Sequence, residues 1–183
     1  GADDQILVIT KKGEYYTTNF DLSNHFDEDL LKIEKYDPEK VWTVALVDAD
    51  QQGYRYIKRF VMEASAKKVG FIGENPESRL LLISDNVYPR FKVVFGGADK
   101  SKPAMEIDVE EFIGVKGIKA KGKRISTFEV GEVIELEPTR WPEPEAEGSE
   151  PEEETQDDAP DTSGGDDNDS DVLDELTGQM KLF

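Results

Sequence analysis

Short runs of apolar and β-branched residues, separated by turn residues, follow one another between residues 5 and 137. The first run, residues 6–10 (ILVIT), is followed by Lys11, Lys12 and Gly13 and then by residues 14–20 (EYYTTNF). Two β-type runs joined by a short turn that contains glycine are typical of an antiparallel hairpin. The pattern therefore predicts a β-hairpin over residues 6–20.

The same pattern recurs and predicts three further hairpins. They join residues 41–47 with 54–60, residues 80–84 with 88–95, and residues 115–120 with 123–128. Shorter runs predict additional strands at residues 30–34, 69–72, 105–109 and 133–136. The phenylalanines that close the hairpins lie 40, 35 and 33 residues apart, at Phe20, Phe60, Phe95 and Phe128. A repeat of this size in an all-β chain is typical of a propeller-like array of small sheets.

Together these runs predict about twelve strands, or about three four-stranded blades. We therefore expect an all-β fold over residues 1–140, in the form of a partial β-propeller or β-pinwheel-like array. Three blades do not close a ring, so further N-terminal blades are expected in the parent protein. A sandwich or barrel with a similar number of strands is the alternative. Only residues 27–35 and 171–176 compete as helices, and both segments are short.

The charge of the chain is divided unevenly along its length. Residues 1–140 hold 25 acidic and 21 basic side chains, a net charge of −4, whereas residues 141–183 hold 16 acidic and one basic side chain, a net charge of −15. A segment of that composition cannot bury enough apolar surface to offset the entropy of ordering. We expect residues 141–183 to be a disordered acidic tail that competes for basic surface on the domain. A tail that only maintains solubility is the alternative.

Several classes of site are not supported by the sequence. The chain has no cysteine, and its single histidine, His25, lacks partners for a metal or catalytic site. Asp48 and Asp50 imitate the start of a calcium loop, but Arg59 occupies the position of the bidentate glutamate. No apolar run is long enough to span a membrane, and no secretory leader opens the chain. We expect a cytoplasmic protein that carries no cofactor and no catalytic constellation in this segment.

Basic residues gather in the last predicted hairpin. Five cations fall within nine positions and are spaced by two glycines; they are Lys116, Lys119, Lys121, Lys123 and Arg124. Such a cluster at the edge of a blade suits contact with DNA phosphates, which is electrostatic and independent of sequence. The alternative is that these lysines only solvate a hairpin turn and protect a sheet edge.

A second basic group lies in the middle hairpins, at Arg55, Lys58, Arg59, Arg90 and Lys92. Strand alternation places Arg55 and Arg59 on one face and Lys58 on the other. All five residues are candidate DNA contacts, and the face with the two arginines is expected to extend a cationic stripe around the outer edge of successive blades. The alternative is a solvated strand face on which arginine stems cover apolar neighbours.

Three segments together resemble the blade repeats in the C-terminal domain of type IIA topoisomerase A subunits, the gyrase A and topoisomerase IV A family. They read ILVITKKGEYYTTNF, LLLISDNVYPRFKV and FIGVKGIKAKGKRISTFEVGEV. In that family an apolar strand, a Lys-Gly turn and a strand bearing lysine or arginine recur in each blade. The resemblance covers about residues 4–137. The Arg- and Gly-rich box of gyrase-type subunits has no counterpart here, which favours a topoisomerase IV-like subunit or a degenerate gyrase-like one.

The resemblance implies a function for this domain and partners for the parent protein. The domain would bind double-stranded DNA and hold or bend it for strand passage during relaxation and decatenation. The parent would be a nucleoid-associated, ATP-dependent topoisomerase whose catalytic tyrosine lies outside this chain and whose partner is the ATPase (B) subunit. The alternative is a protein-interaction propeller or sandwich whose acidic tail recruits basic partners, with no role in DNA binding.

The last five residues end a polar tail with three apolar side chains around a lysine. This pentapeptide, QMKLF, resembles the Gln-x-x-Leu-Phe peptides that dock on the bacterial sliding clamp. Gln179 would be the polar anchor, and Leu182 and Phe183 would fill an apolar pocket. Contact with a sliding clamp is therefore expected. The alternative is that the two apolar side chains pack back on a blade.

Overall fold

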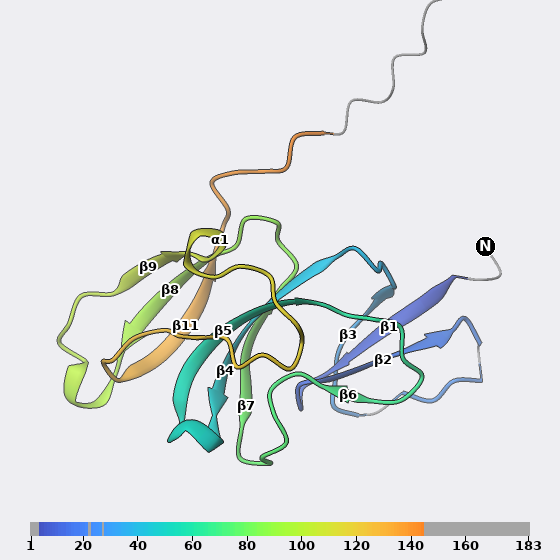
Figure 1. Cartoon of the computed structure of the whole chain (residues 1–183), viewed down its shortest axis with the longest axis horizontal. Coiled ribbons are helices and arrows are strands. Elements are labelled where there is room, and N and C mark those ends of the chain that lie inside the picture. Colours follow the sequence, from blue (N-terminus) through green and yellow to red (C-terminus); the bar gives the residue numbers. More distant parts are fainter. Residues whose placement is uncertain (1–3, 22, 27, 145–183) are drawn as a thin grey trace, which may run out of the picture. The chain divides into compact units, whose positions relative to one another are not determined.

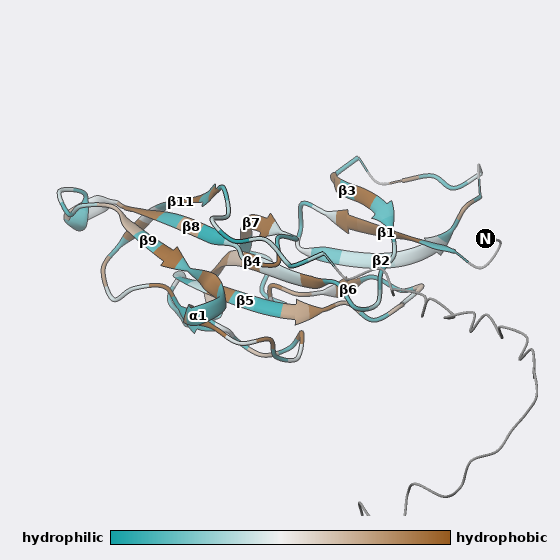
Figure 2. Ribbon diagram, turned by 90° about the horizontal axis from the view of Figure 1, so that it is seen from above, coloured by the Kyte–Doolittle hydropathy of each residue, from teal (hydrophilic) through white to brown (hydrophobic). Residues whose placement is uncertain are grey.

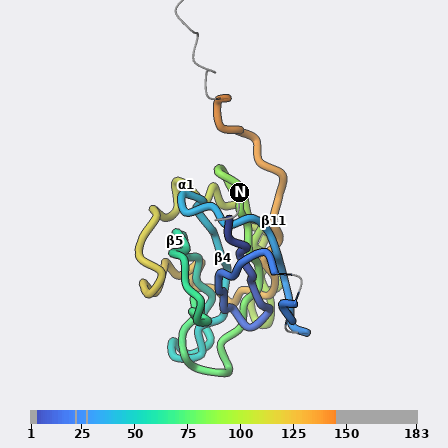
Figure 3. Tube along the Cα trace, turned by 90° about the vertical axis from the view of Figure 1, so that its right-hand side faces the viewer, coloured from blue at the N-terminus to red at the C-terminus, as the bar shows by residue number. Residues whose placement is uncertain are grey.

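The computed structural model describes residues 4–21, 23–26 and 28–144. These residues form three antiparallel sheets that follow one another in a row (Figure 1), and the view along this row in Figure 3 shows their strands overlapping. The predicted all-β, blade-like array is confirmed. The predicted acidic tail beyond residue 144 and the C-terminal pentapeptide lie outside the described residues.

The first sheet contains the first predicted hairpin. It consists of four strands in the order β3-β1-β2-β6, namely β1 (Gln5–Thr10), β2 (Glu14–Asn19), β3 (Leu30–Lys35) and β6 (Val69–Gly70). Residues 30–35 are therefore a strand and not part of a helix. The hairpin turns at Gly13, whose φ of 77° lies in the left-handed region that glycine adopts readily.

The second sheet contains the second predicted hairpin. It consists of four strands in the order β10-β5-β4-β7, namely β4 (Val41–Asp48), β5 (Tyr54–Val61), β7 (Arg79–Ser84) and β10 (Lys123–Arg124). The turn between β4 and β5 includes the short 3-10 helix η1 (Ala49–Gln51), where the Asp48 carboxylate accepts a hydrogen bond from the Asp50 amide. The segment that imitates a calcium loop is therefore a hairpin turn.

The third sheet has three strands, and one short α-helix lies between the second and the third of them along the chain. The strands lie in the order β11-β8-β9 and are β8 (Arg90–Phe95), β9 (Met105–Asp108) and β11 (Val130–Leu136). The 3-10 helix η2 (Gly97–Asp99) lies between β8 and β9, and the helix α1 (Val109–Phe112) follows β9. No helix among the described residues is long and apolar enough to span a membrane.

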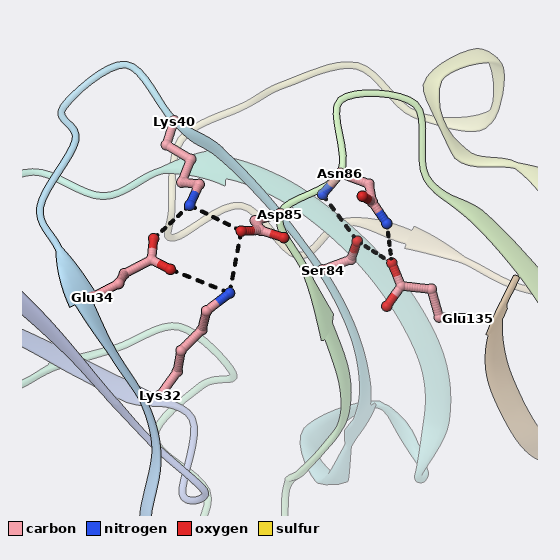
Figure 4. A network of polar contacts seen from close by, with 7 residues as sticks. All are labelled: Lys32, Glu34, Lys40, Ser84, Asp85, Asn86 and Glu135. Carbon is pink, nitrogen blue, oxygen red and sulfur yellow. Dashed lines mark hydrogen bonds and ion pairs between the residues drawn. The ribbon is translucent and has the colours of Figure 1, made fainter. Parts of the chain in front are cut away.

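The third predicted hairpin is wrong, although both of its strands exist. β7 pairs with β4 in the second sheet, whereas β8 pairs with β9 and β11 in the third. The polar residues that suggested a turn bind neighbouring sheets instead (Figure 4). Asp85 accepts from Lys32 on β3, and the side chains of Ser84 and Asn86 donate to Glu135 on β11. The chain passes from one sheet to the next at this point.

The fourth predicted hairpin is also wrong. Residues 115–120 form no strand, and the two residues of β10 pair with β5 of the second sheet. The reason is that β5 pairs with β4 on one edge only and leaves its other edge free. The segment that follows β8 and β9 in the sequence pairs with this free edge. β6 completes the free edge of β2 in the same manner. Each of the first two hairpins is therefore completed by a strand from later in the sequence, and the third sheet holds three strands among the described residues.

β4, inside the second sheet, is buried on both faces. Alternate residues of β4 point in opposite directions, and Trp42, Val44 and Leu46 join one core cluster with Leu7 of the first sheet, whereas Ala45 joins the cluster of the third sheet. Because both faces are covered, β4 is an almost continuous apolar run and not an alternating one. Figure 2 shows how the hydropathy varies from residue to residue along the other strands.

Candidate nucleic-acid interface

The predicted basic cluster lies on a loop and not on a hairpin. This basic loop, residues 113–122, leaves α1 and crosses β5 before β10 begins (Figure 1). The Lys116 amide donates to the Arg59 carbonyl at 2.9 Å, and the Ala120 amide donates to the Gly117 carbonyl at 3.0 Å. The Ile118 side chain packs against the core between the first and second sheets. Ile113, the first residue of the loop, is buried in the other core cluster, so the loop lies against the domain through two apolar side chains and its backbone.

The lysines of this region point outward. Lys116, Lys119, Lys121 and Lys123 are exposed, and Arg124 is half-buried. The Lys123 ammonium donates to the Phe112 carbonyl at 3.2 Å and lies 4.3 Å from the centre of the Phe112 ring. The Arg124 guanidinium stacks 3.4 Å above the centre of the Tyr54 ring. These two aromatic contacts fix the two cations that directly follow the loop.

A cleft of about 500 Å³ runs beside the basic loop. One wall is the segment that contains β6, and the other is formed by residues 118–121. Three surface lysines lie at this cleft, Lys68 on one wall and Lys119 and Lys121 on the other. Asp48, Asp50 and Glu74 also line it, so its charge is mixed. Its apolar lining includes Phe71, Ile72 and Ile118.

Lys58 lies at the base of this cleft and is only 6% exposed. Its ammonium donates to the Phe71 carbonyl at 2.7 Å and to the Ile118 carbonyl at 2.6 Å. Burial lowers the pKa of Lys58 to about 8, although the nearby charge of Asp48 acts in the opposite direction. This lysine was predicted to contact DNA, but its ammonium is already bound inside the protein.

Arg59 and Arg55 do not form the predicted cationic surface. The predicted alternation is right, but residues 57–60 of β5 are buried, so neither face of this part of the strand is open to solvent. Arg59 is 7% exposed and directs a long contact of 3.4 Å from Nη1 to the Ile113 carbonyl. Burial lowers the pKa of Arg59, and Glu110 and Asp108 act in the opposite direction. Arg55 is half-buried and donates to the Gly53 carbonyl at 2.9 Å.

Arg90 and Lys92 lie on the third sheet and are separate from the basic loop. They alternate with the buried Phe91 and Val93, so their side chains occupy the face that points away from the second sheet. Arg90 forms an ion pair with Glu106 at 2.7 Å and also donates to the Glu137 carbonyl. The structure therefore does not bring this pair together with the lysines of the cleft.

Lys68 is a residue that sequence reasoning missed. It lies on the wall of the cleft opposite Lys119 and Lys121. The sequence does contain a signal for this residue. Lys67 and Lys68 directly precede a short β-type run, and Lys121 and Lys123 lie in the same way at the start of β10. Both segments complete the edge of a hairpin. No group of three or more metal-ligating side chains occurs among the described residues.

The three small antiparallel sheets and the basic loop define an all-β domain of the blade-array class. A protein-family model matches residues 1–137, and the chain belongs to that family, the topoisomerase C-terminal domain of Bacteroidota. This match confirms the resemblance at the level of a topoisomerase C-terminal domain. No curated protein sequence matches the chain.

Proposed function

We propose that this domain is the non-catalytic, DNA-binding C-terminal domain of a topoisomerase IV-like A subunit. It would hold or bend duplex DNA for strand passage during relaxation and decatenation. The observation that carries this proposal is the outward set of lysines on the basic loop, in a chain whose family is that of a topoisomerase C-terminal domain. The catalytic tyrosine and the partner ATPase subunit would lie elsewhere in the parent enzyme.

The proposed contact surface consists of Lys116, Lys119, Lys121 and Lys123, with Lys68 on the opposite wall of the cleft. Phosphates would be the targets, because lysine ammonium groups on a loop read charge and not base sequence. A Cβ atom added at Gly114 or Gly117 would meet nothing within 4 Å, so the backbone of the loop is open to a close approach. Lys58 and Arg59 are not part of this surface, because both are buried.

The proposal predicts a loss of affinity and of salt dependence when the loop loses its charge. Replacing Lys116, Lys119 and Lys121 together by glutamine should weaken binding to a duplex of any sequence. The slope of log affinity against log salt should fall by about 0.9 for each phosphate contact removed. Fluorescence anisotropy at several salt concentrations measures both quantities.

A matched control removes three exposed lysines that lie elsewhere, Lys11, Lys12 and Lys100. Its affinity and slope should stay close to those of the unmodified chain. An unchanged slope in the loop variant, or an equal loss in the control, would show that the basic loop is not the contact surface. The domain would then be better explained as a protein-interaction module.

We also propose that the C-terminal pentapeptide contacts a bacterial sliding clamp through Gln179, Leu182 and Phe183. Its support is the sequence alone, in which an apolar pair ends a strongly acidic segment. A fluorescent peptide of residues 168–183 should bind purified clamp, and replacing Leu182 and Phe183 by alanine should abolish binding, because the apolar plugs provide most of the affinity. Equal binding by both peptides would contradict the proposal.

A further inference from the structure

We infer that Lys58 is the positioning residue of the basic loop: its ammonium ties the loop to the first two sheets and so sets where Lys119 and Lys121 stand. The expected effect on DNA binding rests on the proposed function of the loop. The hydrogen bonds by which Lys58 holds the loop do not depend on that function.

The two hydrogen bonds of Lys58 join three parts of the molecule. The side chain begins on β5, in the second sheet, and its ammonium reaches the carbonyls of Phe71 and Ile118. Phe71 belongs to the edge of the first sheet, because its amide donates to the Gly13 carbonyl at 2.9 Å. Ile118 belongs to the basic loop. One side chain therefore connects two sheets and the segment that carries the exposed lysines.

The hydrogen bond from Lys58 to Ile118 holds the middle of the loop. The loop is bonded to β5 through the Lys116 amide, and the chain is bonded to β5 again where the Ile125 amide donates to the Arg55 carbonyl. The Lys58 bond to Ile118 lies between these two points, directly before Lys119. A segment held at both ends and at its middle has few accessible backbone conformations, so the positions of its lysines are restricted.

The local packing leaves no easy substitute for this lysine. An apolar side chain of the same length would leave the carbonyls of Phe71 and Ile118 without their donor in a buried site, and an unsatisfied buried carbonyl is costly. The loop also closes tightly over Lys58, since a Cβ atom on Gly122 would lie 2.6 Å from the Lys58 Cγ atom. The aliphatic stem of Lys58 is thus enclosed, and its ammonium is hydrogen-bonded to the two carbonyls.

A positioning role and a contact role give different results with DNA. If Lys58 bound a phosphate, its removal would lower the salt slope by about 0.9. If Lys58 orders the loop, its removal leaves the number of phosphate contacts unchanged, and DNA must order the loop on binding. We therefore expect Lys58→Met to weaken DNA binding by about threefold to tenfold with an unchanged slope.

The test begins with hydrogen exchange of the full chain without DNA. In Lys58→Met, the amides of residues 117–121 should exchange faster, while those of β1, β4 and β8 keep their protection. Lys58→Arg, which retains donors, should restore part of the protection. The matched control is Lys92→Met, which removes a half-buried lysine of the third sheet and should leave the loop unchanged. Unchanged loop exchange in Lys58→Met would overturn the inference, whether or not the chain binds DNA.

A second measurement uses the unmodified protein, in case Lys58→Met does not fold. Reductive methylation followed by mass spectrometry should modify Lys119 and Lys121 quickly and Lys58 slowly, because the Lys58 ammonium is enclosed and bound. Methylation of Lys58 at the rate of Lys119 would show that the tie is not made in solution. If exchange and methylation agree with the inference but the unmodified chain does not bind DNA, the proposed function fails and the positioning role remains.

Discussion

Lys58 and Lys119 lie beside the same cleft, but they differ in what surrounds their ammonium groups. Lys119 is exposed, whereas Lys58 is enclosed by the core and bound to two carbonyls. Desolvation disfavours the charged form of a buried lysine, and this effect lowers the pKa of Lys58 to about 8. Two residues of one type thus have different chemistry because β5 is buried and the loop is not.

This difference predicts a pH dependence of stability. The pKa of Lys58 is lower in the folded protein than the ordinary lysine value of 10.5, so the unfolded chain binds more protons between pH 8 and 10.5. The free energy of unfolding should therefore rise with pH in this window, relative to Lys58→Met, by about 1 kcal/mol per pH unit. The contribution is lost as the pH falls through 8.

Urea unfolding of both proteins at pH 7.5, 8.5 and 9.5 measures the difference. Comparison with the variant removes the contributions of other titrating groups, which the two proteins share. A difference that does not change with pH would mean that the two carbonyls keep the pKa of the Lys58 ammonium near its ordinary value.

At the residue scale, the sequence could predict strand alternation but not burial. The placement of Arg55 and Arg59 on one face of β5, and of Lys58 on the other, follows from the period of two. Whether a face meets water depends on which sheet packs against it, and that depends on residues far away in the chain. The exposed lysines 116, 119 and 121 could be predicted because glycines and charges surround them and leave little apolar surface to bury.

At the scale of elements, strands were easier to predict than their pairing. The apolar runs of β1, β4, β5, β7 and β8 identify them as strands, and the Lys-Gly and Gln-Gly turns identify two hairpins. The two-residue strands β6 and β10 have almost no pattern of their own. They exist because β2 and β5 each present a free edge, and an edge is recognised by its unpaired backbone groups and not by sequence.

The turn before β10 provides a prediction at this scale. Gly122 has a φ of 86°, and a Cβ atom there would lie 2.3 Å from the Ile57 carbonyl oxygen. Gly122→Ala should therefore lower the free energy of unfolding by about 1–3 kcal/mol, through backbone strain and the clash. Gly117→Ala is the matched control, because the space around Gly117 is open. Equal stability of the two variants in urea unfolding would contradict the packing described here.

At the scale of the whole domain, polar contacts link all three sheets at one side (Figure 4). Lys32 and Glu34 of β3 and Lys40 before β4 surround Asp85, which follows β7, and the neighbouring Ser84 and Asn86 bind Glu135 of β11. Both Lys32 and Lys40 also lie about 5 Å from the centre of the Trp42 ring. The sequence could not predict these contacts, because they join residues from separate sheets.

This network predicts that Asp85 stabilises the domain in a manner that depends on pH. Burial alone would raise the pKa of Asp85, but hydrogen bonds from Lys40 and Lys32 outweigh burial and lower it below 3.8. A carboxylate with a lowered pKa contributes stability above its ordinary pKa and loses it as the pH falls through the lowered value. Asp85→Asn should therefore destabilise the domain at pH 7 by roughly 1 kcal/mol, because the site is partly exposed.

The difference between the two proteins should shrink as the pH is lowered from 4 to 2, since the unmodified Asp85 then becomes neutral as well. Thermal unfolding over that range measures it, with Glu39→Gln as a control that removes an exposed acid outside the network. High salt should reduce the Asp85 effect at pH 7 only in part, because the ion pairs are half-buried and are screened less than surface pairs. A constant difference at every pH would mean that Asp85 acts through its shape and hydrogen bonds, and that its charge does not hold the three sheets together.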